Sequence, residues 1–485
     1  MLKSKENGCQ RYDVIVLGCG IAGLGAGRVL KGAKVNFLMI EGSDRVGGRI
    51  HTVNMKNLQN NNEIVRVEAG AQWIHGKHNE LYQYANQFKM IRTELSEEAE
   101  GDYIREDGVH FNAFFVRKID FKIGQLLEEC EKFVEHKSDK NFVFPTSIAE
   151  YVEEKFDDFL KTLETNEERT QARQLLDWHR KFQIIDNSCD YFNDISAKDW
   201  GNYSFNGESC QTHINVTNGM SAITDKLYEE LKNFIRLNKA VKHVLWDAPE
   251  GIKIICEDES SYLAQNVICT FSLGVLKQHQ MKMFSPPLLR KHKDVIESIG
   301  FGTINKIFLK FNERWWDKDW KGLQMLWNDD LDENSHWTKY MTGFDVAYPV
   351  PENTLIGWIG GKGAKLIEKI TDEEIAEHCT DIIRKFLKDK NIPNPSHVFC
   401  SRWNTNKFIG GAYSYTSKNT DNIERWEKIL SFPIIKETSN GHKNLLLFAG
   451  EAVHEQYFST VHGAFLSGIQ QAELILNFRK KCAKL

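Results

Sequence analysis

The chain has 485 residues, 41% of them hydrophobic, with a formal net charge of -5 and a pI near 6.4. This length predicts about two or three domains, and the mild acidity argues against a nucleic-acid partner and suits a cationic substrate. Ten cysteines are scattered without a C-x-x-C pair or a metal-ligand cluster, so we expect reduced thiols, no metal and no disulfides.

The first predicted element is a strand, a glycine turn and a helix between Asp13 and Gly27. Three glycines have the G-x-G-x-x-G spacing of a dinucleotide site, in which they allow a tight turn, close approach of backbone to a pyrophosphate and helix-strand packing. They are Gly18, Gly20 and Gly23. A second buried strand, Lys34 to Ile40, ends in Glu41, whose carboxylate can bind an adenosine ribose. A plain glycine-rich turn is the alternative, but the flanking strands favour dinucleotide binding.

The next motif, GSDRVGGRIHT, places Arg49 beside two glycines, where its guanidinium can meet a phosphate bidentately. The fingerprint, Glu41 and GGRIHT together resemble the FAD-dependent amine oxidase family, which includes polyamine and monoamine oxidases. VEAGAQWIHG, from Val67 to Gly76, is similar to the family segment that runs beneath the flavin ring. The resemblance implies that FAD contacts Ala22, Gln72 and Trp73 and that His75 lies in a substrate tunnel. The alternatives are a core tryptophan and a satisfied loop histidine.

From Asn79 to Trp178 the chain is predicted to be helical and is strongly charged. Its carboxylate-rich stretches, Glu94 to Asp102 and Glu150 to Asp158, indicate solvated helix faces, with an acidic mouth for polycations as the alternative. IDNSCDYFNDIS then resembles the polyamine oxidase segment that supplies an acid and a serine to the tunnel. That match implies Asp186 and Ser188. Better-known family members have a glutamate where Asp186 stands, which leaves the preferred chain length open.

A return to α/β texture follows, with a helix from Asn218 to Leu231 and a strand from Ile235 to Leu245. The resemblance implies that the backbone of Val241 contacts adenine. A hairpin is predicted around Glu257 to Ser260, and residues after Pro287, up to Ser298, are predicted to be helical.

The strand from Thr303 to Phe311 sets Lys306 among apolar neighbours, where an ammonium group is costly without a partner. In the amine oxidase family a lysine on this strand holds a water at flavin N5, so the resemblance implies that role for Lys306. A surface lysine at a strand edge is the alternative. Aromatic and β-branched residues predict further strands, and a helix follows them. These elements are expected around Gln324 to Trp327, Trp337 to Phe344, Leu355 to Gly361 and Glu373 to Leu387.

The segment GGAYSY, residues 410–415, bears on how the cofactor is held. Monoamine oxidases have a flavin-bonded cysteine where Ala412 stands, so the resemblance implies noncovalent FAD. Tyr413 and Tyr415 share one face of an extended segment, and we expect one of them to lie beside the substrate amine. Thr460 stands where monoamine oxidases have a second tyrosine, so a full aromatic cage is not expected.

Residues 445–472 form a predicted strand, a glycine, an acid and a helix, which in this family make the second half of the flavin site. The resemblance implies that Glu451 holds the ribityl or pyrophosphate region. Backbone at Thr460 and Val461, near the helix start, would stabilise negative charge at flavin N1-C2=O.

The expected fold is α/β, with a Rossmann-like FAD-binding domain and an α+β substrate-binding domain built from discontinuous segments. We assign the FAD-binding domain to 11–78, 218–285 and 401–480, a helical and substrate-domain insertion to 79–217, the substrate-binding domain to 286–400 and a tail to 481–485. A monomer is expected.

The expected activity is FAD-dependent oxidation of N1-acetylspermine, N1-acetylspermidine or spermine by dioxygen, giving a shorter polyamine, an aminoaldehyde and hydrogen peroxide. An oxidase of another amine or amino acid is the first alternative, although an amino acid would need an arginine aimed at its carboxylate. A non-redox binding protein like the GDP dissociation inhibitors is the second. Chromatin demethylases of the family carry large additional domains that do not fit in this length.

Two features concern location. No apolar run reaches the roughly 18 residues of a membrane span, and the polar start lacks a signal peptide's apolar centre, so we expect a soluble, non-secreted protein. Ala483-Lys484-Leu485 is a conservative variant of the S-K-L signal. It predicts binding to the peroxisomal import receptor and a peroxisomal location, with the cytoplasm as the alternative, and it favours acetylated polyamines.

Overall fold

The computed structural model describes residues 10–59, 63–96, 99–203, 212–329, 331, 335–351, 353–437 and 443–482. The predicted targeting tripeptide, Ala483-Lys484-Leu485, lies outside these residues. Within them, every helix is too short or too polar to cross a membrane.

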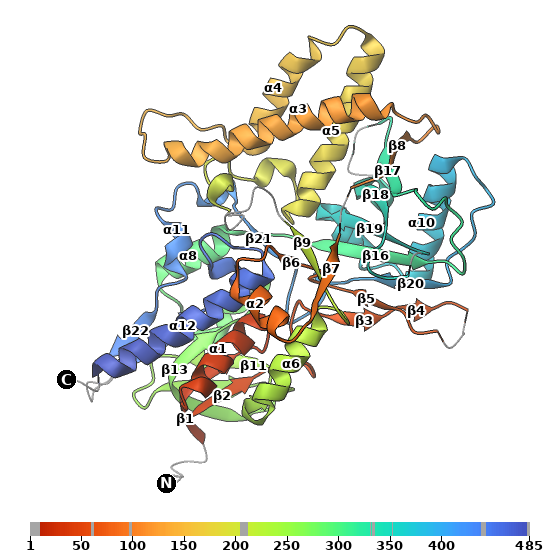
Figure 1. The fold of residues 1–485 in the computed structure, drawn as a ribbon. Coiled ribbons are helices and arrows are strands. Elements are labelled where there is room, and N and C mark those ends of the chain that lie inside the picture. The colour runs from red at the N-terminus through yellow and green to blue at the C-terminus, as the bar shows by residue number, and fades with distance from the viewer. Residues whose placement is uncertain are drawn as a thin grey trace.

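A nine-stranded sheet lies at the lower left of Figure 1. Its strands are β1 (Gln10–Leu17), β2 (Phe37–Ile40), β10 (Ile235–Arg236), β11 (Val241–Leu245), β12 (Ile252–Cys256), β13 (Ser261–Cys269), β14 (Phe284–Ser285), β22 (Ile434–Glu437) and β23 (Lys443–Phe448). Strands β2, β1, β13 and β23 lie side by side and parallel, although they come from the start, middle and end of the chain. Residues 14–17 of β1 are fully buried, because helices cover both faces of this parallel sheet.

Helices α1 (Ile21–Gly32), α2 (Glu80–Gln87), α6 (Ser221–Leu231) and α12 (Val461–Cys482) pack on one face of this sheet. The other face carries α7 (Leu273–Met283), α8 (Arg290–Ser298) and α11 (Trp426–Ile429). Helices α1 and α12 approach closely, since a Cβ atom on Gly468 would lie 1.9 Å from the carbonyl oxygen of Ala22. This contact fastens the last described helix to the first one.

A seven-stranded sheet lies at the right of Figure 1. Its strands follow the order β4 (Lys56–Asn57), β20 (His397–Cys400), β16 (Ile304–Lys310), β19 (Thr354–Gly360), β18 (Met341–Val346), β17 (Gly322–Leu326) and β8 (Asp102–Arg105). One face is buried against α9 (Gly361–Ile367) and α10 (Asp372–Leu387), in a core that includes Ile307 and Leu309. Because side chains alternate along a strand, Lys306 and Phe308 belong to the opposite face. That face lies toward α5 (Asn166–Asp186).

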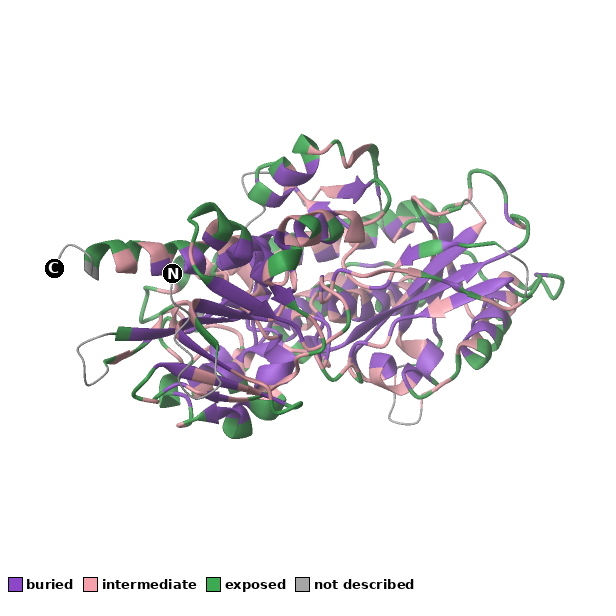
Figure 2. Cartoon of the chain, turned by 90° about the horizontal axis from the view of Figure 1, so that it is seen from below, coloured by how far each residue is buried: buried purple, intermediate pink, exposed green. Residues whose placement is uncertain are grey.

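Helix α5 forms a layer with α3 (Ala113–Glu131) and α4 (Ile148–Leu160) at the top of Figure 1. Each of the three begins at a residue whose side chain accepts backbone N–H bonds, and α5 has a complete capping box of Thr165 and Glu168. Short pairings complete the fold: β3 (Thr52–Asn54) with β5 (Arg66–Glu68), β6 (Ile74–His75) with β9 (His213–Val216), β7 (Ile91–Leu95) with β9, and β15 (Gly300–Phe301) with β21 (Ser414–Tyr415). Figure 2 shows buried residues filling both sheets and exposed residues on the outer sides of the helices.

Most expected elements are present, and the α/β fold class is confirmed. Four details differ from expectation. The second strand begins at Phe37, because Lys34 has a φ of +54° and turns the chain. The segment predicted as one strand, 235–245, is divided at Asn238, which has a φ of +56°. The predicted helical stretch 79–178 also contains β7 and β8, and residues Trp337–Tyr340 form a 3₁₀ helix before β18. The division into domains stays a prediction.

The contact between α1 and α12 gives a first testable prediction. Gly468→Ala should destabilise the folded protein by roughly 1–3 kcal/mol, because the added methyl group would force α12 away from Ala22. Gly32→Ala is the matched control, since a Cβ atom there meets nothing within 4 Å. Urea unfolding should show a lower midpoint for Gly468→Ala than for Gly32→Ala. Equal midpoints would mean that the helices do not pack as closely as described.

Candidate active site

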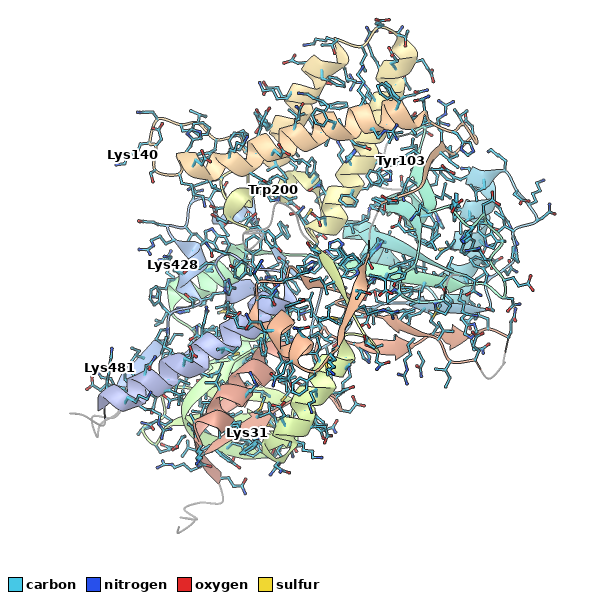
Figure 3. The ribbon with its side chains drawn as sticks, in the orientation of Figure 1. Lys31, Tyr103, Lys140, Trp200, Lys428 and Lys481 are labelled. Carbon is cyan, nitrogen blue, oxygen red and sulfur yellow. The ribbon has the colours of Figure 1, made fainter. Side chains whose placement is uncertain are left out.

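A cavity of about 1200 Å³ lies where the two sheets and the helical layer meet. Its walls come from every part of the fold: the β1–α1 turn, the start of α12, strands β16 and β19, and helices α3 and α5. Figure 3 places Trp200, one of the lining residues, below α3 and above the nine-stranded sheet. Typical pockets for drug-sized ligands measure about 300–1,000 Å³, so this cavity has room for a ligand larger than that class.

The β1–α1 turn leaves open space where a phosphate would approach. Gly18 has a φ of +97°, and a Cβ atom on Gly23 would lie 2.1 Å from the Gly18 carbonyl oxygen. A Cβ atom on Gly20 would meet no protein atom within 4 Å, and Gly20 and Ala22 line the cavity. The N-cap residue Gly20 provides no side-chain cap, so the first N–H groups of α1 are available to an anion. The turn therefore fits a dinucleotide pyrophosphate.

Glu41 is held at the same end of the cavity by the backbone around it. Its carboxylate accepts hydrogen bonds from the N–H of Cys19 at 2.7 Å and of Ser43 at 2.9 Å. The Lys239 N–H donates to the Glu41 carbonyl at 2.7 Å, which brings the start of β11, and with it Val241, to this end of the cavity. Glu41 and Val241 thus lie at one end of the cavity, and their predicted contacts with a ribose and an adenine stay predictions.

Arg49 and Glu451 form a partly buried ion pair in the cavity wall. The Arg49 Nη1 atom lies 2.8 Å from Glu451 Oε1 and 2.8 Å from the Ala412 carbonyl oxygen. The other carboxylate oxygen accepts hydrogen bonds from the N–H groups of Ser414 and Ser459. The pair fixes three distant segments around the cavity, and the predicted contacts of both residues with the cofactor stay predictions.

Lys306 is a buried residue of the cavity wall, not a surface lysine. Its side chain is in contact with Gly70 and Gln72, donating to the Gly70 carbonyl at 2.7 Å and to Gln72 Oε1 at 2.8 Å. Its Nζ atom also lies 4.6 Å from the ring centroid of Trp358 and 5.9 Å from that of Trp73. Two hydrogen bonds and two aromatic faces therefore fix the direction of this ammonium group.

Trp73 and two histidines form an aromatic group beside Lys306. The rings of Trp73 and His213 stack at 4.3 Å, and His75 meets His213 edge-on at 5.3 Å. Burial lowers the pKa of His213 to about 4. The pKa of His75 is held well below its usual value, chiefly by burial and to a smaller extent by the neighbouring His213 and His462. Both imidazoles are therefore neutral at neutral pH. His75 Nδ1 and Trp73 Nε1 have no protein partner among the described residues.

His213 is a cavity residue that the sequence reasoning missed. It reaches this position because β6 and β9 pair with His75 opposite His213, and their segments are far apart in the chain. No local motif marks it.

The two tyrosines and Thr460 also line the cavity. The Tyr413 hydroxyl donates to the Ile185 carbonyl at 3.0 Å, which ties the ring to the end of α5. Tyr415 is buried in β21. Thr460 precedes α12, and its hydroxyl accepts the Gly463 N–H at 3.0 Å and donates to the Tyr457 carbonyl. Helix α12 begins at Val461, which also lines the cavity, so its first backbone N–H groups, which have no partner within the helix, lie at this wall.

Asp186 lies at the C-terminal end of α5 and lines the cavity. Its side chain is exposed to the cavity, and the protein packed around it raises its pKa to about 6. Ser188 is different. The chain turns at Ser188 with a φ of +50°, the residue is fully buried, and it is not part of the cavity lining. The structure therefore does not bring Ser188 to the predicted tunnel.

Helix α3 adds carboxylates to the cavity, whereas the described carboxylates of the two stretches noted in the sequence lie outside its lining. Glu128 and Glu131 line the cavity. Burial, with the charge of Glu128, raises the pKa of Glu131. The Glu150 to Asp158 stretch lies outside the lining and forms caps and ion pairs on α4, as for a solvated helix face.

Comparisons with known proteins agree with this geometry. The family model for flavin containing amine oxidoreductase matches residues 21–476. The chain is 28% identical over 506 residues to a Bos taurus peroxisomal N(1)-acetyl-spermine/spermidine oxidase, covering 96% of this chain and 94% of that protein. It is 27% identical to human lysine-specific histone demethylase 2, covering 96% of this chain and 53% of that protein. Among solved structures, putrescine oxidase bound to putrescine aligns with a TM-score of 0.69 at 17% identity, covering 97% of this chain and 100% of that chain.

The open space at Gly20 gives a prediction about cofactor retention. Gly20→Ala should fold normally, since its Cβ atom meets no protein atom within 4 Å, but should lose FAD because the methyl group enters the space reserved for the pyrophosphate. The measurement is the flavin-to-protein ratio after dialysis, with the melting temperature of the cofactor-free protein as the folding control. Gly32→Ala should retain FAD. Full occupancy in Gly20→Ala would remove the pyrophosphate from this turn.

Proposed function

Because the chain belongs to the flavin containing amine oxidoreductase family, as its motifs predicted, we propose that it oxidises linear polyamines such as N1-acetylspermine, N1-acetylspermidine or spermine. The chain is an FAD-dependent oxidase that acts on the CH–NH bond of an amine. The proposed products are a shorter polyamine, an aminoaldehyde and hydrogen peroxide.

One observation carries the polyamine proposal. The cavity continues from the aromatic wall around Lys306 to carboxylates at Asp186, Glu128 and Glu131. A substrate with an amine at the reacting end and further ammonium groups along its length would find an opposite charge for each. A simple monoamine would make no use of these carboxylates.

The positions of the arginines in the cavity lining argue against an amino acid as substrate. The arginines of the described lining are Arg45 and Arg49. The Arg45 guanidinium donates to backbone carbonyls of residues 46, 48 and 50, and Arg49 pairs with Glu451. Both lie at the dinucleotide end, so neither is placed for a substrate carboxylate.

The residues divide the chemistry among them. FAD, when bound, accepts a hydride from the carbon next to nitrogen and passes the electrons to dioxygen. Trp73, Trp358 and Tyr413 form an apolar wall that favours the neutral form of the reacting amine, which has the lone pair the oxidation needs. His75 is neutral and can accept a hydrogen bond or a proton from this amine. The N–H groups at the start of α12 can stabilise negative charge on the cofactor side.

Lys306 supplies a fixed ammonium group beside the reacting atoms. Its bonds to Gly70 and Gln72 hold it in one direction, so it can position a water for hydrolysis of the oxidised amine. A non-redox binding protein would not need a buried lysine in this position, which supports the enzyme over a protein of the GDP dissociation inhibitor type. The peroxisomal location and the import receptor stay predictions from the sequence.

A substrate panel tests the proposed function. Peroxide release from the FAD-loaded enzyme should give a kcat/KM for at least one spermine or spermidine derivative that exceeds those for benzylamine, putrescine and free amino acids by at least about 10-fold, or 1.4 kcal/mol. A dimethyl-lysine peptide tests the similarity to the histone demethylase. A higher kcat/KM for a monoamine, an amino acid or that peptide would contradict the proposal.

Asp186 gives a prediction with a pH dependence. Asp186→Asn should raise KM for polyamines by about 10-fold with a smaller change in kcat, the pattern of lost ground-state binding. Because burial raises the pKa of Asp186 to about 6, its carboxylate is charged above this pH and neutral below it. The KM of the wild-type enzyme should therefore rise as pH falls through about 6, and this rise should be smaller in the variant. An identical KM profile for both proteins would take Asp186 out of substrate binding.

Lys306→Met should keep the cofactor and slow turnover by at least about 10-fold, because the ammonium group acts on the reaction. Lys310→Met is the matched control: Lys310 is also buried on β16 but pairs with Glu63 and lies outside the cavity lining. Steady-state kcat and flavin content should be measured for both variants. A normal kcat in Lys306→Met would contradict the proposed role of Lys306 in turnover.

A further inference from the structure

A further carboxylate lies in the cavity wall on the same face of the seven-stranded sheet as Lys306, two strands away. Asp345 of β18 pairs with Ile356 of β19, while Lys306 of β16 pairs with Trp358, two residues further along β19. Resting on the polyamine function proposed above, we propose that Asp345 binds the distal ammonium group of a linear diamine or polyamine whose other end reacts beside Lys306.

The surroundings of Asp345 leave it without a cation. Gln324 donates one amide hydrogen to Asp345 Oδ1 at 2.8 Å and the other to the Glu100 carbonyl at 2.9 Å. The Ala99 N–H lies 3.4 Å from Asp345 Oδ2. Among the described residues, no lysine or arginine forms an ion pair with this carboxylate. The Gln324 amide and the Ala99 N–H orient the Asp345 carboxylate, but neither carries a positive charge that would balance it.

The protonation behaviour of Asp345 agrees with this geometry. Burial raises its pKa to about 7, the hydrogen bonds from Ala99 and Gln324 oppose the rise, and the charge of Glu100 adds to it. An isolated buried carboxylate is costly, so a cation that enters the cavity and pairs with it is strongly favoured.

Two structural elements give the length of the path from the reacting end to Asp345. Across the sheet, two strand spacings of about 4.8 Å and two residues of about 3.3 Å separate Lys306 from Asp345, which is roughly 12 Å. Along α5, the turn that ends at Asp186 lies against Tyr413, whose hydroxyl donates to the Ile185 carbonyl. Trp178 lies over β18, where its Nε1 donates to the Thr342 carbonyl at 3.0 Å. These eight residues of helix also span about 12 Å.

The path between these ends is lined by α5 on one side and the sheet on the other. Phe182 and Gln183 of α5 and Thr342 of β18 line the cavity along it. Tyr103 of β8, labelled in Figure 3, packs edge-on against Trp178 at 5.1 Å beyond this part of the lining. A chain of single bonds of about 1.5 Å advances about 1.25 Å per bond, so roughly nine bonds fill this path.

The chemical class that follows is a linear amine with two nitrogens about nine bonds apart. A monoamine of the same length would fill the path but leave Asp345 unpaired, while a short diamine would not reach it. Asp345 therefore selects for chain length.

The test compares three alkyl amines on the FAD-loaded enzyme, by anaerobic calorimetric titration: n-octylamine, 1,4-diaminobutane and 1,8-diaminooctane. The eight-carbon diamine should bind at least about 10-fold more tightly than the other two, and Asp345→Asn should reduce this advantage to under about 3-fold. Asp421→Asn is the matched control, because Asp421 accepts a hydrogen bond from Ser196 Oγ at 2.6 Å and lies outside the cavity lining.

A second variant covers the case in which Asp345→Asn does not fold. Asp345→Glu keeps the charge and brings it one methylene closer to Lys306, so the tightest diamine should become one carbon shorter. The proposal is overturned if the wild type shows no diamine advantage, if Asp345→Asn keeps it, or if Asp345→Glu leaves the optimal length unchanged. Since these are binding constants, they are independent of peroxide release, and a failure of the polyamine oxidase function would appear only in the peroxide panel.

Discussion

The ion pair between Arg49 and Glu451 is the interaction on which the rest of the site depends. Its two residues come from segments about 400 positions apart, and through Ala412, Ser414 and Ser459 it holds the loop before β21 and the approach to α12 in one place. A partly buried pair of this kind gains its value from complete hydrogen bonding, and here every oxygen of the carboxylate has a partner. Without it, the start of α12 and the two tyrosines would have no common frame.

Around this frame the cavity changes character along its length. The dinucleotide end is formed by glycine backbone, helix N-termini and Glu41. The middle is formed by Lys306, aromatic rings and imidazoles that burial keeps neutral. Beyond it, Asp186, Asp345 and the carboxylates of α3 provide negative charge. An amine in this cavity is favoured as the neutral base at one end and as the cation at the other, which is the arrangement that oxidation of a long polyamine requires.

The sequence predicted those parts of the site that depend on local pattern. The glycine turn, Glu41 and the strand with Lys306 are recognisable because each needs a particular residue at a particular spacing, and the family resemblance joined them. His213, Glu128, Glu131 and Asp345 were missed, because each reaches the cavity through strand pairing or helix packing between distant segments. Ser188 is the opposite case, because the sequence placed it in the tunnel and the structure does not. The chain turns at Ser188, just after α5, so this residue lies outside the cavity wall, whereas Asp186 lines it.

The most direct test of the account is the absorption spectrum of the purified, FAD-loaded protein mixed with a polyamine in the absence of oxygen. If the aromatic middle and the acidic end of the cavity cooperate as described, the polyamine should bleach the flavin bands within the time of one turnover, and air should restore them with release of peroxide. A spectrum that stays yellow and unchanged with spermine, spermidine and their acetylated forms would contradict the account.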